Sequence, residues 1–231
     1  MTPEFFGNRG GRPIRPLWAV VLGLFLLASA ITPERADAAS RPSHHIYCIR
    51  GVFNVFSLGM DELCDKLRKL GMNASVHNHM VWGSIADEAA ANYKSGKARN
   101  IIVIGHSAGA SAVADITARL GEVGVPVKLA VELDCLWGTT ASGQVEQFLN
   151  YYVADGAGKL VVKGPKFRGM LRNISLSKNY PDIGHLNIDK NPRVHSLVIG
   201  HIRQALASSP AQPPTPPSPP AAGTTGASAT R

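Results

Sequence analysis

This chain of 231 residues contains few cysteines and few aromatic residues. Its three cysteines, Cys48, Cys64 and Cys135, lack the spacing of a metal site, so we expect buried free thiols, although one pair could oxidise in an exported protein. Aromatic residues make up 6% of the chain. The formal net charge is +8, but the basic residues are dispersed rather than interleaved with aromatic ones, which argues against nucleic-acid binding.

The chain also lacks an apolar run long enough for a typical membrane-spanning helix. Its longest apolar segment, Leu17–Ile31, is shorter than the roughly 20 residues that such a helix needs. This segment follows several arginines and precedes Ala36-Asp37-Ala38, which has the form of a signal-peptidase site, with Ala28-Ser29-Ala30 as a second candidate. We therefore interpret residues 1–38 as a signal peptide and expect a periplasmic or secreted protein. An uncleaved N-terminal membrane anchor is the alternative.

The middle of the chain alternates between two hydrophobic patterns. Short apolar runs predict strands at 45–50, 74–79, 101–104, 126–133, 147–153 and 171–176. Helical spacing predicts helices at 60–70, 84–95 and 111–120, and a last one beginning at Pro192. This alternation predicts an α/β domain over residues 43–207, with a mostly parallel central sheet of about five to six strands and helices on both faces. Residues 208–231 are rich in Pro, Ala, Ser and Thr, which predicts a disordered tail.

One predicted strand runs into a Gly-x-Ser-x-Gly pattern. Ile101–Ile104 reads as a strand buried on both faces, and Gly105, Ser107 and Gly109 follow it before a helix of small residues. This arrangement is typical of a nucleophile elbow, a sharp strand-to-helix turn that lifts a serine hydroxyl above the sheet. The two glycines allow a close approach of strand and helix backbones, and the N–H of Ala108 would face the same point as the hydroxyl.

A nucleophilic serine needs a base and a carboxylate that orients it, and in this kind of fold both follow the serine along the chain. Asp134 closes the next predicted strand and is our candidate for the carboxylate, with Asp155 and Asp182 as rivals. His185 lies downstream on a loop beside the flexible Gly184 and is our candidate for the base.

The other seven histidines fit the role of base less well. Four precede the serine, His106 sits inside the elbow with its side chain directed away from the hydroxyl, and two lie on the last predicted helix. They are His44, His45, His77, His79, His106, His195 and His201.

The region from about Ile46 to Leu206 resembles the α/β-hydrolase superfamily, in a small, lidless form similar to bacterial lipase-like and thioesterase-like proteins. The resemblance implies hydrolysis of small carboxylic esters or thioesters without a cofactor or a metal. It also implies a second oxyanion donor after the first strand, where Arg50-Gly51-Val52 replaces the commoner His-Gly-x. We expect this donor to be the N–H of Val52, or that of Phe53.

The long cap insertion of many relatives is absent, which leaves an open cleft. The apolar residues expected to wall it are Val52, Phe53, Phe56, Trp82, Leu136 and Trp137.

The leading hypothesis is therefore an exported serine hydrolase that forms an acyl-enzyme on Ser107. An acyltransferase or an amidase using the same site is one alternative. Another is a non-catalytic module that binds the cell envelope. A basic segment with Lys159, Lys163, Lys166 and Arg168 could draw the domain to an anionic envelope or membrane surface, although a solvated loop also accounts for these charges.

Overall fold

The computed structural model describes residues 43–52, 58–154, 156 and 158–208. The predicted signal peptide lies outside these residues, as does the predicted tail apart from Ser208. Phe53, Phe56 and Asp155 also lie outside them. Within the described ranges, no helix combines the length and the apolar character needed to cross a membrane.

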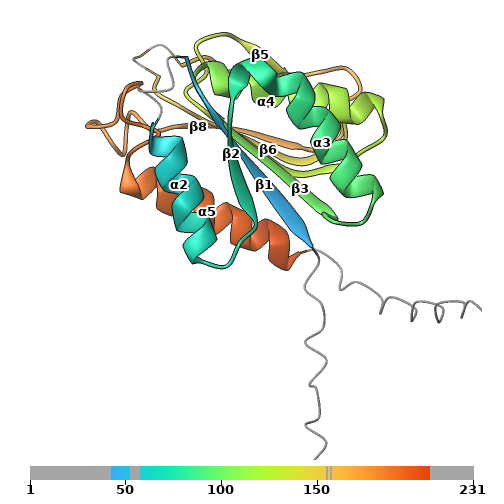
Figure 1. The fold of residues 1–231 in the computed structure, drawn as a ribbon. Helices are drawn as coiled ribbons and strands as arrows, with labels where there is room; N and C mark the ends of the chain where they lie inside the picture. Colours follow the sequence, from blue (N-terminus) through green and yellow to red (C-terminus); the bar gives the residue numbers. More distant parts are fainter. Residues whose placement is uncertain (1–42, 53–57, 155, 157, 209–231) are drawn as a thin grey trace, which may run out of the picture. The chain divides into compact units, whose positions relative to one another are not determined.

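The core of the domain is a six-stranded sheet in the order β2-β1-β3-β4-β6-β8, and all neighbouring strands are parallel (Figure 1). The strands are His44–Arg50 (β1), Ala74–Asn78 (β2), Asn100–His106 (β3), Val127–Leu133 (β4), Val145–Tyr152 (β6) and Met170–Ser175 (β8). The predicted α/β architecture with a parallel central sheet is confirmed. Parallel strands place all their carboxyl ends at one edge, where ligand sites of open α/β sheets lie.

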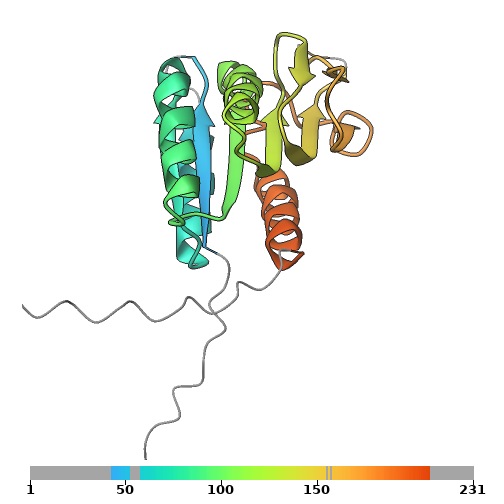
Figure 2. The ribbon, with the colours of Figure 1, turned by 90° about the vertical axis from the view of Figure 1, so that its right-hand side faces the viewer.

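Helices cover both faces of this sheet (Figures 1 and 2). The apolar faces of α2 (Leu58–Lys69) and α5 (Pro192–Ala207) pack on one face, together with inward side chains such as Ile102 and Leu129. On the other face, α3 (Trp82–Lys94) and α4 (Ala108–Glu122) pack against Val103 and Phe148. Alternate residues of each strand thus enter two separate cores, as a sheet buried on both sides requires.

Two short strands form a second parallel sheet that the sequence patterns do not predict. These are β5 (Thr139–Ala141) and β7 (Val161–Lys163), and each has three residues. Runs this short carry no alternation that could distinguish them from loops. The sequence patterns also do not predict the short 3-10 helix η2 (His79–Val81), which separates β2 from α3.

The helix after the elbow is longer than its sequence pattern indicates. It begins at Ala108, directly after Ser107, and ends at Glu122. The prediction of 111–120 missed its first turn because the elbow residues Ala108 and Gly109 carry no amphipathic signal. The free N–H groups of that first turn consequently lie next to the serine.

Candidate active site

Ser107 lies at the junction between β3 and α4, in a conformation that few residues adopt. Its φ is 58° and its ψ is −118°, and only 7% of its surface is exposed. A Cβ added to Gly105 would lie 2.1 Å from the carbonyl oxygen of Gly109, and one added to Gly109 would lie 2.3 Å from the carbonyl oxygen of Ile49. Only glycine permits these approaches, so both positions are required by the sharp turn.

A continuous chain of hydrogen-bonding groups links Ser107 to two residues far along the sequence. The Nε2 of His185 lies 3.2 Å from the Oγ of Ser107, and the Nδ1 of His185 lies 2.8 Å from the Oδ2 of Asp134. Because a carboxylate only accepts hydrogen bonds, this geometry puts the imidazole proton on Nδ1 and turns the Nε2 lone pair toward the serine. The imidazole ring and the carboxylate are thus arranged for proton transfer from the serine hydroxyl.

The combination of elbow, parallel sheet and serine–aspartate–histidine order along the chain decides the fold type. The domain has the α/β-hydrolase fold. The resemblance inferred from the sequence is therefore confirmed at the level of the fold.

Asp134 is held as tightly as the serine. It is fully buried, and its φ is 49°. The Oδ1 that does not face His185 accepts a hydrogen bond of 2.8 Å from the N–H of Val153. Among the described non-glycine residues, Asp134 and Ser107 alone have a positive φ. Backbone strain of this kind is retained where the surroundings over-determine it and clusters at functional sites.

The loop that carries His185 is held by two further histidines. The Nε2 of His106 donates to the carbonyl oxygen of His185 at 3.0 Å, and the Nε2 of His195 donates to the carbonyl oxygen of Asp189 at 2.5 Å. Lys66 donates to the other nitrogen of His195 at 2.9 Å. Sequence reasoning placed His106 away from the serine hydroxyl but assigned it no role. The carbonyl oxygen that accepts the hydrogen bond from His106 belongs to His185, 79 residues away, so no local sequence pattern indicates this contact.

Burial governs the charge of the groups beneath this loop. It lowers the pKa of His106 to about 4, and the electrostatic interaction with the neighbouring His185 lowers it further. Burial also raises the pKa of Asp189 to about 6. The Nδ1 of His106 lies 3.8 Å from the Oδ2 of Asp189, which is beyond a hydrogen bond. At neutral pH, His106 is therefore an uncharged donor to the His185 carbonyl.

Gly158 is a site residue that the sequence analysis missed. A Cβ added there would lie 1.9 Å from the Oδ1 of Asp134. The backbone of Gly158, which precedes β7, thus covers the buried carboxylate. The sequence indicates only a segment rich in glycine and lysine, and no signal in it links Gly158 to Asp134.

The two predicted oxyanion donors, Ala108 and Val52, line one open groove. Ala108 is the first residue of α4, where unpaired N–H groups and the helix dipole favour negative charge. Val52 is 39% exposed, and both residues line the cleft. Arg50, which replaces the commoner histidine, forms a two-pronged ion pair with Asp61 at the start of α2. This arginine therefore ties the end of β1 to a helix.

The rival residues occupy other places. Asp182 is exposed and pairs with Arg193 at 3.0 Å. His45 and His77 both contact the hydroxyl of Ser75, between the first two strands of the chain. The predicted cleft residues Val52, Trp82 and Trp137 line the cleft, whereas Leu136 does not.

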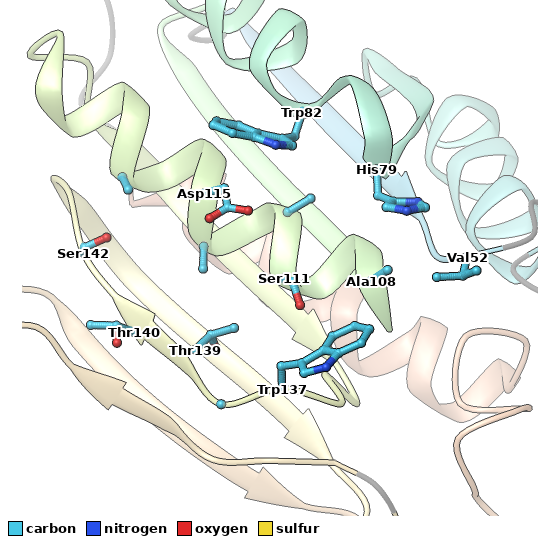
Figure 3. Close-up of a pocket in the computed structure, with 14 residues that line it drawn as sticks. Val52, His79, Trp82, Ala108, Ser111, Asp115, Trp137, Thr139, Thr140 and Ser142 are labelled. Atoms are coloured by element: carbon cyan, nitrogen blue, oxygen red, sulfur yellow. The ribbon is translucent and has the colours of Figure 1, made fainter.

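An open groove of about 720 Å³ begins at Ala108 and follows α4 (Figure 3). Besides Val52, η2 and the start of α3 line it on one side and the segment 137–142 lines it on the other, while α4 forms its floor. The described residues include no cluster of three or more His, Cys, Asp or Glu side chains that could hold a metal ion.

No family model matches the chain, and no curated protein matches it by sequence. Solved structures of similar fold include an α/β-superfamily protein from Xanthomonas campestris pv. campestris, described as a hydrolase (10% identity, 68% of this chain and 99% of that chain, TM-score 0.40). Another is human thioesterase 2 (8% identity, 71% of this chain and 96% of that chain, TM-score 0.45). A third is an acetyl xylan esterase (11% identity, 71% of this chain and 99% of that chain, TM-score 0.41). At these identities the likeness concerns the fold alone.

Proposed function

We propose that the protein is a serine hydrolase that cleaves carboxylic esters or thioesters through an acyl-enzyme on Ser107. The observation that carries this proposal is the hydrogen-bonded series from Asp134 through His185 to Ser107. An open groove begins at Ala108, the residue that follows the serine. A buried carboxylate, a partly exposed imidazole and a serine on a strained turn are the groups that acyl transfer requires.

In this mechanism, the Oγ of Ser107 attacks the acyl carbonyl carbon while the Nε2 of His185 takes the hydroxyl proton. Asp134 stabilises the resulting imidazolium through the Nδ1 hydrogen bond. The N–H groups of Ala108 and Val52 would bind the oxyanion. His185 then protonates the leaving alcohol or thiol, and a water molecule, deprotonated by His185, attacks the acyl carbon and frees Ser107.

Labelling with a fluorophosphonate tests the nucleophile directly. We expect the full chain to form one covalent adduct on Ser107, and S107A to form none, because the alanine lacks the attacking oxygen. S111A is the matched control, since Ser111 lies one helical turn away. Its hydroxyl contacts the Sγ of Cys135 at 3.1 Å and does not contact His185. Equal labelling of wild type and S107A, or no labelling of the folded wild type, would refute the proposal.

The same preparation separates hydrolysis from the alternatives. Release of p-nitrophenol from p-nitrophenyl acetate with equimolar acetate production indicates hydrolysis. Formation of an acetylated alcohol when glycerol is added would indicate an acyltransferase instead, and turnover of anilides but not esters would indicate an amidase. Absence of turnover with every substrate would favour a non-catalytic module.

We also propose that the protein is exported, with residues 1–38 acting as a signal peptide. The arginines, the short apolar segment and Ala36-Asp37-Ala38 support this proposal. The intact mass of the protein recovered from a cell envelope fraction tests it. A protein that keeps its full N-terminus and stays in the cytoplasm would contradict export.

A further inference from the structure

The groove beside Ser107 has a distinctive floor formed by one face of α4. The α4 side chains that line the groove are all small or polar, and they are Ala108, Ser111, Ala112, Ala114, Asp115 and Ala118. At 1.5 Å per residue, Ala108 and Ala118 are separated by about 15 Å along the helix axis. The floor is therefore long and shallow, and it begins at a predicted oxyanion donor.

Two exposed indoles stand on either side of this floor. Trp82 is 38% exposed and Trp137 is 54% exposed. Figure 3 shows Trp82 on one side of α4 and Trp137 on the other, with Ser111 and Asp115 on the helix between them. Exposed indole faces are apolar platforms with a polar N–H at the edge, and they suit a flat partner that is apolar on its faces and polar at its rim.

Hydrogen-bonding groups also occur along the whole groove. The carboxylate of Asp115 lies on the floor, and Thr140 and Ser142 line one wall. Partial burial raises the pKa of Asp115. An alkyl chain lying along this path would remove water from these groups without replacing their hydrogen bonds, which is unfavourable. The groove therefore favours a partner that carries hydroxyl or amide donors.

The charge of the chain distinguishes between such partners. Asp115 alone would suit a cation held between the indoles, but the formal net charge of +8 repels cationic ligands from the protein as a whole. A neutral, polyhydroxylated ring satisfies both observations, because its C–H faces can stack on Trp82 and Trp137 while its hydroxyls bond to Asp115.

We propose that the groove binds the sugar part of an O-acylated saccharide, so that the enzyme removes an acyl group from a carbohydrate. This inference rests on the proposed function of Ser107. The bond between the acyl carbon and the sugar oxygen breaks, and the acyl carbon becomes bonded to the Oγ of Ser107. The sugar leaves with a proton from His185, and water then releases the acid. The groove determines which alcohol is accepted.

Equilibrium binding tests the groove independently of catalysis. The S107A full chain would be titrated by calorimetry with cellotriose, chitotriose and mannotriose. We expect at least one trisaccharide to bind, and we expect W82A or W137A, each added to S107A, to raise its Kd at least about tenfold. Leu70, an exposed apolar residue directly after α2, provides the matched control L70A.

Kinetics provide the second readout. For the O-acetylated forms of the same trisaccharides, we expect kcat/KM to exceed that for p-nitrophenyl acetate at least tenfold. In W82A, W137A and D115N the loss should be largest for the saccharide ester and should appear mainly in KM. D65N, which changes an exposed aspartate on α2, is the control for D115N.

The outcomes separate the two proposals. If wild type forms no fluorophosphonate adduct and hydrolyses no ester, the function proposed for Ser107 fails, whatever the binding experiment gives. If the adduct forms but no trisaccharide binds and none of its esters is preferred, the saccharide proposal alone fails. It also fails if the tryptophan variants selectively lose activity on p-nitrophenyl laurate, which would indicate an acyl-chain groove, or on S-acetylpantetheine, which would indicate a thioester groove.

Discussion

At the scale of single residues, the site depends on groups that never touch a substrate. His106 is buried beneath the elbow, and its Nε2 donates to the backbone of His185. The carbonyl that accepts this bond belongs to the residue whose ring faces Ser107, so the contact fixes the backbone from which the imidazole projects. We therefore regard His106 as a positioning residue.

Replacing His106 with leucine should lower activity without removing any reacting group. We expect kcat for p-nitrophenyl acetate to fall at least about tenfold, with little change in KM, because small displacements of a catalytic group greatly slow proton transfer. H106Q, which keeps an N–H donor, should recover part of kcat. A purely structural role would instead lower the Tm in both variants and leave kcat unchanged.

Gly158 allows an equally local test, because its Cα faces the carboxylate of Asp134. In G158A the added methyl group would meet the Oδ1 that accepts the Val153 hydrogen bond. We expect kcat/KM to fall at least about tenfold as the carboxylate is pushed away from His185. Gly200 is exposed in the middle of α5, and a Cβ added there would meet nothing within 4 Å, so G200A is the matched control. It should keep full activity, and equal activity of both variants would contradict the assignment.

At the scale of secondary-structure elements, the site is assembled from the carboxyl ends of neighbouring strands. Ser107 follows β3 and Asp134 follows β4. β3 and β4 are hydrogen-bonded neighbours, and the N–H of Ser107 itself donates to the carbonyl oxygen of Leu133 at 3.1 Å. Backbone hydrogen bonds between β3 and β4 therefore fix the serine and the aspartate relative to each other. His185 instead lies on a loop that is held by side chains.

This difference between residues placed by strands and residues placed by long-range side-chain contacts explains what could be predicted from the sequence. The strands, the elbow glycines, Ser107 and Asp134 follow from local runs of β-branched residues and from chain order, and the structure brings these predicted residues together with His185. The short strands β5 and β7 have no such pattern, because their pairing depends on where the main sheet places them. The roles of His106 and Gly158 depend on contacts with residues 79 and 24 positions away, respectively, so no local signal indicates them.

At the scale of the whole molecule, stability depends on a buried acid. Glu132 is fully buried on β4, and the hydroxyl of Thr139 donates to its carboxyl group at 2.9 Å. Burial raises the pKa of Glu132 to about 8, so it is mostly protonated at neutral pH in the folded state. In the unfolded chain its pKa is near the ordinary value of 4.5. The folded state therefore binds more protons between these two values, and the free energy of unfolding falls as pH rises through this interval.

Substituting Glu132 with glutamine should remove this dependence. From pH 5 to pH 7.5, we expect the contribution of Glu132 to reduce the free energy of unfolding of wild type by about 3 kcal/mol, a loss that E132Q should not show. Urea unfolding at several pH values measures the difference. His106 titrates over an overlapping interval with the opposite sign, because its pKa is lowered, so only the comparison between wild type and E132Q isolates Glu132. Parallel curves for the two proteins would contradict a protonated Glu132.

The first and last described residues of the domain lie near each other, at the amino-terminal end of β1. Ser43 and His44, just before and at the start of β1, line a cavity together with Leu206 and Ala207 at the end of α5. Ser107, Asp134 and His185 lie at the opposite end of the strands. A short linker could therefore join these two points into a circular backbone without crossing the groove. A domain immobilised through either point would present its catalytic edge away from the support, which makes it well suited to surface display and to fusion at both ends.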